Sequence, residues 1–163
     1  MGTAGVCYDE NKYIYIKDAL NKHNNYRKNH NSPPLEINSK LNKMAILYLD
    51  NLINSVKSYS TNIYNNEPLG ENILICNYEK TPEEICINWY NEESNYKYNL
   101  ESFQKGTNHF TQMIWKSSKE FGFAYKFQNN RTYGVALYYP SGNKFGEFQK
   151  NVGKKKYENF DHN

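Results

Sequence analysis

The sequence predicts a single domain of the α+β class. Apolar residues recur at helical spacing through most of the chain, and a strand pattern appears only towards its end. Helices and strands do not alternate as they do in folds with a parallel sheet, so antiparallel strands are expected. A length of 163 residues is enough to bury one hydrophobic core.

Two helices are predicted in the first third of the chain. Residues 15–30 carry apolar side chains at near-helical spacing with polar residues between them, which is typical of an amphipathic helix. Pro33 and Pro34 end it, because the residue before a proline is pushed out of the helical region. Between Asn38 and Val56 apolar residues repeat every three or four positions, which is the strongest helical pattern in the chain.

The middle of the chain contains an apolar run and two shorter helices. A polar loop at 57–68 leads to the apolar run at 73–76. Thr81 suits the N-cap of a third helix and Pro82 suits its first position. A short apolar helix is expected at 109–116.

The strand pattern follows. Residues 121–128 and 132–139 are rich in strand-forming types, and residues 129–131 between them predict a hairpin turn. Residues 153–163 include three consecutive lysines and are expected to form a disordered basic tail, and residues 1–14 an N-terminal extension.

Composition and charge exclude several classes of function. The chain has 20 Lys and Arg against 17 Asp and Glu, a formal net charge of +3, which gives little reason to expect binding to nucleic acid or to a membrane surface. Only 38% of residues are hydrophobic, and no run approaches the roughly 20 apolar residues that cross a bilayer. Neither a nucleic-acid partner nor a transmembrane segment is therefore expected.

The three cysteines are Cys7, Cys76 and Cys86, which are too few for a disulfide-stabilised miniprotein and lack the CxxC spacing of a zinc ribbon. In an oxidising compartment Cys76 and Cys86 could form a disulfide and leave Cys7 free, whereas all three would be thiols in a reducing one. No apolar signal-peptide core follows Met1, which fits a cytosolic protein or a mature secreted chain with an added Met.

Four histidines limit where acid–base chemistry or metal binding can occur. His162 lies in the predicted tail. His23, Arg27 and His30 lie on adjacent turns of the first helix, where a solvated or capping face is expected. His109 differs because it opens an apolar helix, where a polar ring needs a hydrogen-bonding partner.

Glu71 and Glu92 are the expected partners of His109. Glu71 stands just before an apolar run, and Glu92 comes three residues after Trp89, so each is anchored by neighbours that favour burial. One His with two carboxylates could form a cleft with perturbed titration, and it is also close to a metal site. The alternative is a buried, hydrogen-bonded His–Glu network that holds a helix end against a loop.

Six short motifs stand in a fixed order along the chain. They are HNNYR at 23–27, PPL at 33–35, GENI at 70–73, WYNE at 89–92, GTNHFTQMIW at 106–115 and YPSGN at 139–143. Together they resemble the signatures of the CAP superfamily, also called SCP/TAPS and named for cysteine-rich secretory proteins, antigen five and pathogenesis-related proteins. The chain is most similar to its short single-domain members, which include Golgi-associated pathogenesis-related and parasite-secreted venom-allergen-like proteins. The resemblance predicts one CAP domain at 15–152.

For the fold, the resemblance implies an α-β-α sandwich with a central antiparallel sheet between helical layers. It also implies a large cleft lined by two His and two Glu. Three of these positions match His109, Glu71 and Glu92, whereas the fourth falls near Tyr59 or Ser60 and is not a His. Because zinc-binding members use both His, the resemblance implies at most a weak site for zinc or another divalent metal at His109, Glu71 and Glu92, and no resident cofactor.

For function, the resemblance implies a secreted, extracellular, non-enzymatic protein. Such a protein binds sterol or another lipid, modulates host or target cells through a protein partner, or does both. Immunomodulation is one form of this modulation. A monomer or a homodimer is expected. One alternative is a hydrolase in which His109 is the general base, oriented by Glu71 or Glu92. Another is a protein that acts through surface contacts, and a cytosolic or Golgi-associated location is the alternative to secretion.

Overall fold

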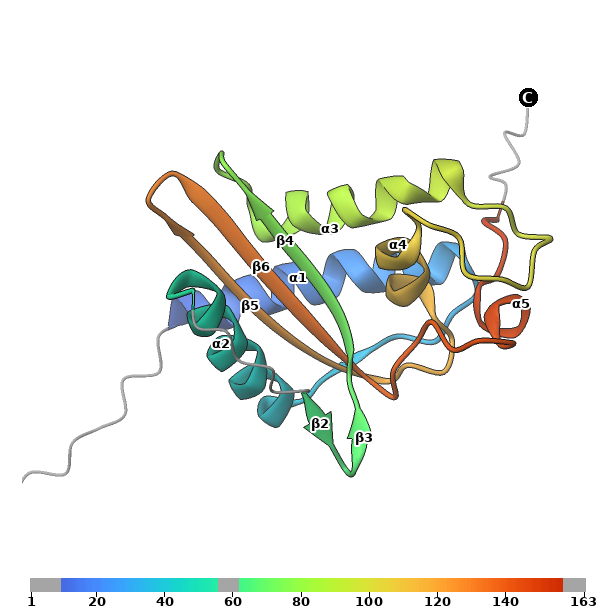
Figure 1. Ribbon diagram of the computed structural model, residues 1–163, viewed down its shortest axis with the longest axis horizontal. Coiled ribbons are helices and arrows are strands. Elements are labelled where there is room, and N and C mark those ends of the chain that lie inside the picture. Colours follow the sequence, from blue (N-terminus) through green and yellow to red (C-terminus); the bar gives the residue numbers. More distant parts are fainter. Residues whose placement is uncertain (1–9, 56–61, 157–163) are drawn as a thin grey trace, which may run out of the picture.

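The computed structural model describes residues 10–55 and 62–156, which form a four-stranded sheet with helices on both faces (Figure 1). This is the α-β-α sandwich that the family resemblance implies. The helices are α1 (Glu10–Asn29), α2 (Ser39–Ile53), α3 (Pro82–Tyr90), the 3-10 helix η1 (Asn91–Asn95), α4 (Asn108–Ile114) and α5 (Phe148–Asn151). The strands are β1 (Glu36–Ile37), β2 (Ile63–Tyr64), β3 (Glu67–Pro68), β4 (Gly70–Cys76), β5 (Glu120–Gln128) and β6 (Arg131–Tyr139).

The sheet has the strand order β1-β5-β6-β4. β5 and β6 form an antiparallel hairpin, and β4 pairs antiparallel with β6. β1 adds a short parallel pairing with β5. A strand of two residues is too short for a sequence pattern to predict it. Because β1 covers β5 only at Glu120 and Phe121, no strand of the described residues lies beside the rest of that edge.

The two faces of the sheet bury separate apolar clusters. α1, α3 and α4 cover one face, where they pack on Phe121, Phe123 and Tyr138 (Figure 1). α2 covers the other face and packs on Val135 and Leu137. Neighbouring residues of a strand point to opposite faces, which is why consecutive residues of β6 belong to different clusters.

Local sequence signals confirm where several elements begin and turn. α3 starts with a capping box, in which Thr81 and Glu84 each accept the other's backbone N–H through a side-chain oxygen. The β5–β6 turn consists of Asn129 and Asn130, with φ of 52° and 57°, a conformation that Asn tolerates better than most residues. α1 begins at Glu10, five residues before the predicted start.

Other segments have structure that their sequence pattern does not reveal. β2, β3 and α5 are too short for a periodic pattern to show. Residues 153–156, assigned by sequence to the tail, lie against the end of α1, where the backbone N–H of Lys156 donates to the carbonyl of Asn29 over 2.8 Å. No helix in the described part of the chain is both long and apolar enough to cross a membrane.

Candidate functional site

His109 and Glu92 form a close polar pair at the start of α4. The Nδ1 atom of His109 lies 2.6 Å from the Oε1 atom of Glu92, and the two side chains are 30% and 21% exposed. An ionised carboxylate only accepts hydrogen bonds, so Nδ1 carries a proton and Nε2 of the neutral ring keeps its lone pair. Glu92 is thus a partner of His109 and leaves Nε2 able to accept a proton or a hydrogen bond.

Glu92 also caps α4. Its Oε2 atom accepts from the backbone N–H groups of His109 (2.9 Å) and Phe110 (3.1 Å), which lack partners inside the first turn of the helix. The N-cap residue Thr107 makes no side-chain capping bond, so the carboxylate takes over this role. A negative charge at this end of a helix is favoured by the helix dipole. Both oxygens of Glu92 are therefore held by hydrogen bonds.

Two buried residues support His109. The indole of Trp89 lies nearly parallel to the imidazole, with ring centroids 6.2 Å apart. The side-chain amide of Asn72, on β4, donates to the backbone carbonyl of His109 over 3.0 Å. Trp89 and Asn72 are each 1% exposed, so His109 rests on close-packed core.

Glu71 is not part of this pair. Neighbouring residues of a strand point to opposite faces, and Asn72 points to the face that carries α4. Glu71 therefore points to the face that α2 covers, where its carboxylate accepts from the Asn62 side chain over 2.9 Å. Burial, followed by the charge of Glu71, raises the pKa of Tyr48 on α2, which agrees with this placement.

The predicted metal ligands do not come together as a site. In the part of the chain that the structure describes, no three His, Cys, Asp or Glu side chains are grouped as a metal ion requires. The expected trio is divided, because His109 and Glu92 pair beside α4 and Glu71 faces α2. Tyr59 and Ser60, expected near the fourth position, lie outside the described residues. The described side chains do not fit a zinc ion.

Arg27 holds the opposite end of α4. It is fully buried, and its guanidinium donates to the backbone carbonyls of Met113 (3.0 Å) and Trp115 (2.9 Å) at the C-terminal end of the helix, and to those of Pro33 and Ser118. Burial lowers the pKa of Arg27 to about 10. Of the two alternatives for this face of the first helix, the solvated one is wrong, because Arg27 is buried and backbone carbonyls replace water around its charge. The capping alternative fits Arg27, which binds the last carbonyls of α4.

His23 is also buried. Its Nδ1–H donates to the carbonyl of Ala19 (2.8 Å), so Nε2 accepts from the hydroxyl of Tyr138 (2.6 Å). Burial lowers the pKa of His23 to about 3, which keeps the ring neutral. The hydroxyl of Tyr138 in turn accepts from Asn72 (3.2 Å), so a chain of hydrogen bonds links α1 to the residue that supports His109. His23 therefore has a structural role.

Cys76 and Cys86 are free thiols, so the structure has the unpaired form of the two alternatives. Cys86 lies on α3 with its Sγ atom 3.5 Å from Nδ1 of His23, and burial raises the pKa of its thiol well above the ordinary value. The thiol of Cys76 donates to the carbonyl of Tyr78 over 3.3 Å. Cys7 lies outside the described residues.

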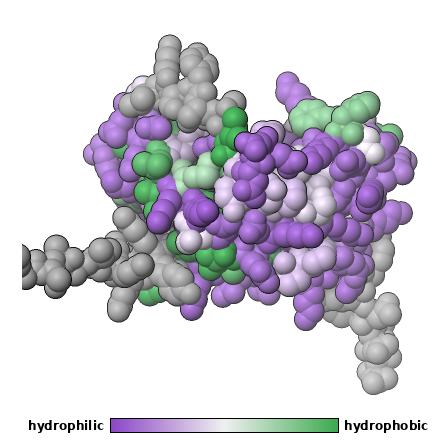
Figure 2. Space-filling view, turned by 90° about the horizontal axis from the view of Figure 1, so that it is seen from below, coloured by the Kyte–Doolittle hydropathy of each residue, from purple (hydrophilic) through white to green (hydrophobic). Residues whose placement is uncertain are grey.

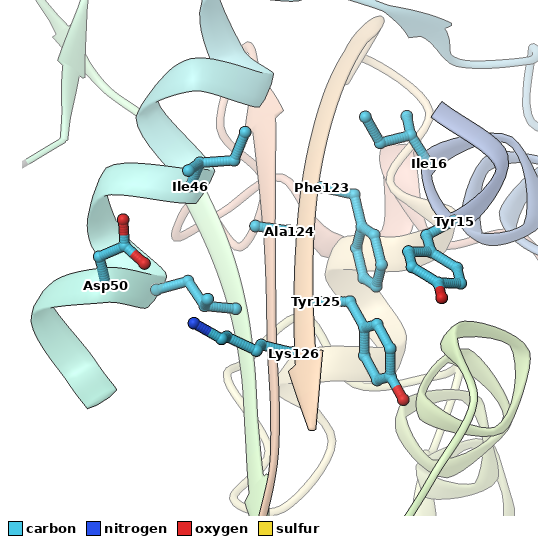
Figure 3. A pocket seen from close by; sticks show the side chains of 9 residues that line it. Tyr15, Ile16, Ile46, Asp50, Phe123, Ala124, Tyr125 and Lys126 are labelled. Carbon is cyan, nitrogen blue, oxygen red and sulfur yellow. The ribbon is translucent and has the colours of Figure 1, made fainter. Parts of the chain in front are cut away.

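A mainly apolar groove lies elsewhere on the domain, between α1, α2 and the uncovered edge of β5 (Figure 3). Its volume is about 210 Å³. The groove crosses the strand edge, so β5 contributes side chains from both faces of the sheet. The lining residues are Tyr15, Ile16, Ile46, Leu49, Asp50, Phe123, Ala124, Tyr125 and Lys126.

Aromatic rings form one side of this groove. Tyr15 and Tyr125 pack edge to face with centroids 5.2 Å apart, and Phe123 lies next to them (Figure 3). The two charged lining residues, Asp50 and Lys126, lie on the side of α2 and have opposite signs. The lining thus combines a large apolar surface with one acid and one base.

The fold and the site define a class of protein, an α-β-α sandwich in which a Glu caps a short helix beside the edge strand β4 and pairs with a His of that helix. The chain belongs to the cysteine-rich secretory protein (CAP) family, whose family model matches residues 20–139, well over half of the chain.

Relatives support this membership. The chain is 35% identical over 147 residues to the human Golgi-associated plant pathogenesis-related protein 1, a match that covers 85% of this chain and 92% of that protein. The structure of Schistosoma mansoni venom allergen-like protein 4 is 20% identical with a TM-score of 0.62, over 91% of this chain and 97% of that one. NaASP2, solved with Zn²⁺, is 20% identical with a TM-score of 0.63, over 92% and 90%. The two structural matches bear on the fold alone.

Proposed function

We propose that this CAP domain is a non-enzymatic binding protein whose ligand is a sterol or another lipid. The observation that carries the proposal is the groove between α1, α2 and β5, where seven of the nine lining residues are apolar or aromatic. A concave, mainly apolar surface with a few polar groups is typical of a small-molecule site. Membership of the family suggests a lipid ligand. The groove offers apolar surface that the hydrocarbon part of a lipid could contact.

The volume of the groove indicates how much of the ligand it holds. An engineered cavity of roughly 150 Å³ binds one benzene molecule, and the groove measures about 210 Å³. One ring or a short length of acyl chain fills this space, and the rest of a sterol or lipid stays outside. Asp50 and Lys126 supply charges for its polar groups.

The His109–Glu92 pair supports the non-enzymatic part of the proposal. Both oxygens of Glu92 are used, one to orient His109 and the other to cap α4. Among the described residues no hydroxyl or thiol forms a hydrogen bond with the His109 ring, so no side-chain nucleophile is paired with this histidine. We therefore propose no hydrolytic step.

We further propose that the protein acts outside the cell, on host or target cells, as a monomer or a homodimer. Membership of a family of secretory proteins supports this location. The human relative is by name Golgi-associated, and that location is the alternative.

Lipid-binding measurements test the proposal. Radiolabelled cholesterol and a fluorescent fatty acid are titrated against the purified chain and against Ile46→Glu, which places a charge in the groove. Leu47→Glu is the matched control, because Leu47 is the next residue of α2, is 65% exposed and is not part of the lining. We expect saturable binding of at least one lipid, weakened about tenfold or more by Ile46→Glu and unchanged by Leu47→Glu. Absence of saturable binding, or equal effects of the two substitutions, would refute the proposal.

A further inference from the structure

Three large apolar side chains are exposed on the loops around α5. Phe145 is 90% exposed, Phe103 58% and Leu100 41%. Leu100 and Phe103 belong to the segment between η1 and α4, and Phe145 belongs to the segment between β6 and α5. Figure 2 shows hydrophobic surface at this end of the molecule, set among hydrophilic residues. Exposed apolar surface with a polar rim is typical of an interaction site.

The two loops are held together by hydrogen bonds. The carboxylate of Glu101, which stands next to Leu100, accepts from the backbone N–H groups of Phe148 (2.7 Å) and Gln149 (3.1 Å). Phe148 is 2% exposed and packs edge to face on the buried Trp115, with centroids 5.2 Å apart. The exposed side chains are therefore carried by backbone that is anchored to the core.

The two segments that carry these side chains have a net positive charge, although the whole chain is nearly balanced. Segments 96–106 and 143–150 contain four lysines and two glutamates, and Glu101 already caps α5. Within the described residues no ion pair engages these lysines. They are Lys97, Lys105, Lys144 and Lys150, all exposed.

We propose that this end of the domain, defined by Leu100, Phe103 and Phe145 with the four lysines, docks on an anionic lipid membrane surface. Exposed Phe and Leu side chains of peripheral proteins bury at the boundary between headgroups and acyl chains, where Phe103 and Phe145 would insert. Each lysine near an anionic bilayer surface adds attraction that falls off within a Debye length. The lysines complement the negatively charged headgroups of such a membrane. The exposed Phe and Leu side chains complement its apolar acyl chains. This surface is separate from the groove and adds a second site to the proposed function.

Vesicle sedimentation tests the proposal. The purified chain is mixed with vesicles of phosphatidylcholine alone or with about 30% phosphatidylserine, at low and at high salt. We expect binding to the vesicles with phosphatidylserine, weakened by salt, about tenfold weaker for Phe145→Ser and about fivefold weaker for Lys144→Gln. Leu47→Ser is the control, because Leu47 is an exposed apolar residue of α2, at the opposite end of the molecule (Figure 1).

A tryptophan reporter shows whether the ring enters the bilayer. The emission of Phe145→Trp should shift to the blue when vesicles with phosphatidylserine are added, whereas that of Leu47→Trp should not. Failure of the wild-type chain to bind these vesicles, or equal binding by Phe145→Ser, overturns the proposal. The groove is assessed separately, because Phe145→Ser should leave cholesterol or fatty-acid binding unchanged and Ile46→Glu should leave vesicle binding unchanged.

Discussion

Glu92 and Arg27 hold opposite ends of the same short helix, α4. The carboxylate of Glu92 accepts from backbone N–H groups at its start, and the guanidinium of Arg27 donates to carbonyls at its end. Each charge has the sign that the helix dipole favours at that end. α4 has only seven residues, which is too short for stability on its own, so the position of His109 depends on these two contacts.

Removing the carboxylate of Glu92 should destabilise the domain. Glu92→Ala leaves two backbone donors and the Nδ1–H of His109 without partners, and we expect the free energy of unfolding to fall by about 2 kcal/mol. Glu92→Gln keeps an acceptor oxygen and should cost less. Urea unfolding measures both variants, and a Glu92→Ala protein as stable as the wild type would show that the cap contributes nothing.

Arg27→Lys should be strongly destabilising despite the conserved charge. A lysine ammonium cannot reach carbonyls spread around a planar guanidinium, so several stay unpaired beside a buried charge, and we expect a loss of about 3 kcal/mol. Arg131→Lys is the matched control, because Arg131 is exposed and donates to the Asn77 side chain. Equal unfolding midpoints for the two variants would contradict this assignment.

The buried His23 should make stability fall in mild acid. Its folded pKa of about 3 lies below the unfolded value of about 6.5, so between these pH values the unfolded chain binds a proton that the folded chain does not. The free energy of unfolding should therefore fall as the pH drops from about 6.5 towards 3, by up to about 1.4 kcal/mol per pH unit. Burial also lowers the pKa of His30, which adds an effect of the same sign.

Urea unfolding at a series of pH values measures this slope. His23→Gln removes the titrating group, so the variant should be less stable at neutral pH but lose less stability on acidification. A slope that the substitution leaves unchanged would assign the acid sensitivity to other groups.

The two described cysteines should differ in reactivity. Cys86 is buried with a raised thiol pKa, whereas Cys76 is partly exposed on the edge strand β4. A maleimide reagent followed by peptide mass mapping should label Cys76 in the native protein and Cys86 only after denaturation. Rapid native labelling of Cys86 would mean that the contact between α1 and α3 opens readily.

Metal content is expected to be low. Glu71 faces α2 and cannot complete a site with His109 and Glu92, so protein purified without chelator should contain far less than one zinc per chain. Elemental analysis measures this directly. Stoichiometric zinc that is lost in His109→Ala would show that residues beyond the described part complete a site.

The elements that the sequence predicts best are those with local causes. The capped start of α3 depends on Thr81 and Pro82, and the β5–β6 turn depends on two asparagines. The pairing of His109 with Glu92 follows from family motifs and from the need of a half-buried ring for a partner. In each case the determining chemistry lies within a few residues or within a recognisable motif.

The features that the sequence does not predict depend on backbone segments that are far apart along the chain. Arg27 is charged and lies on an amphipathic helix, so a solvated side chain is expected from the sequence. Its partners are instead main-chain carbonyls of other segments, and no side-chain pattern in the sequence reveals such partners. The groove exists because β1 stops after two residues and leaves the edge of β5 uncovered, a matter of strand length. The separation of Glu71 from His109 follows from strand alternation, which appears only once β4 is placed.

Whether the groove binds lipid is tested most directly by NMR of the isotope-labelled chain titrated with octanoate, a soluble single-chain lipid. We expect saturable shifts of backbone amides along the groove, including those of Ile16, Leu49 and Ala124, while the amides of His109 and Glu92 do not shift. No saturable shifts, or shifts centred on His109, would contradict it.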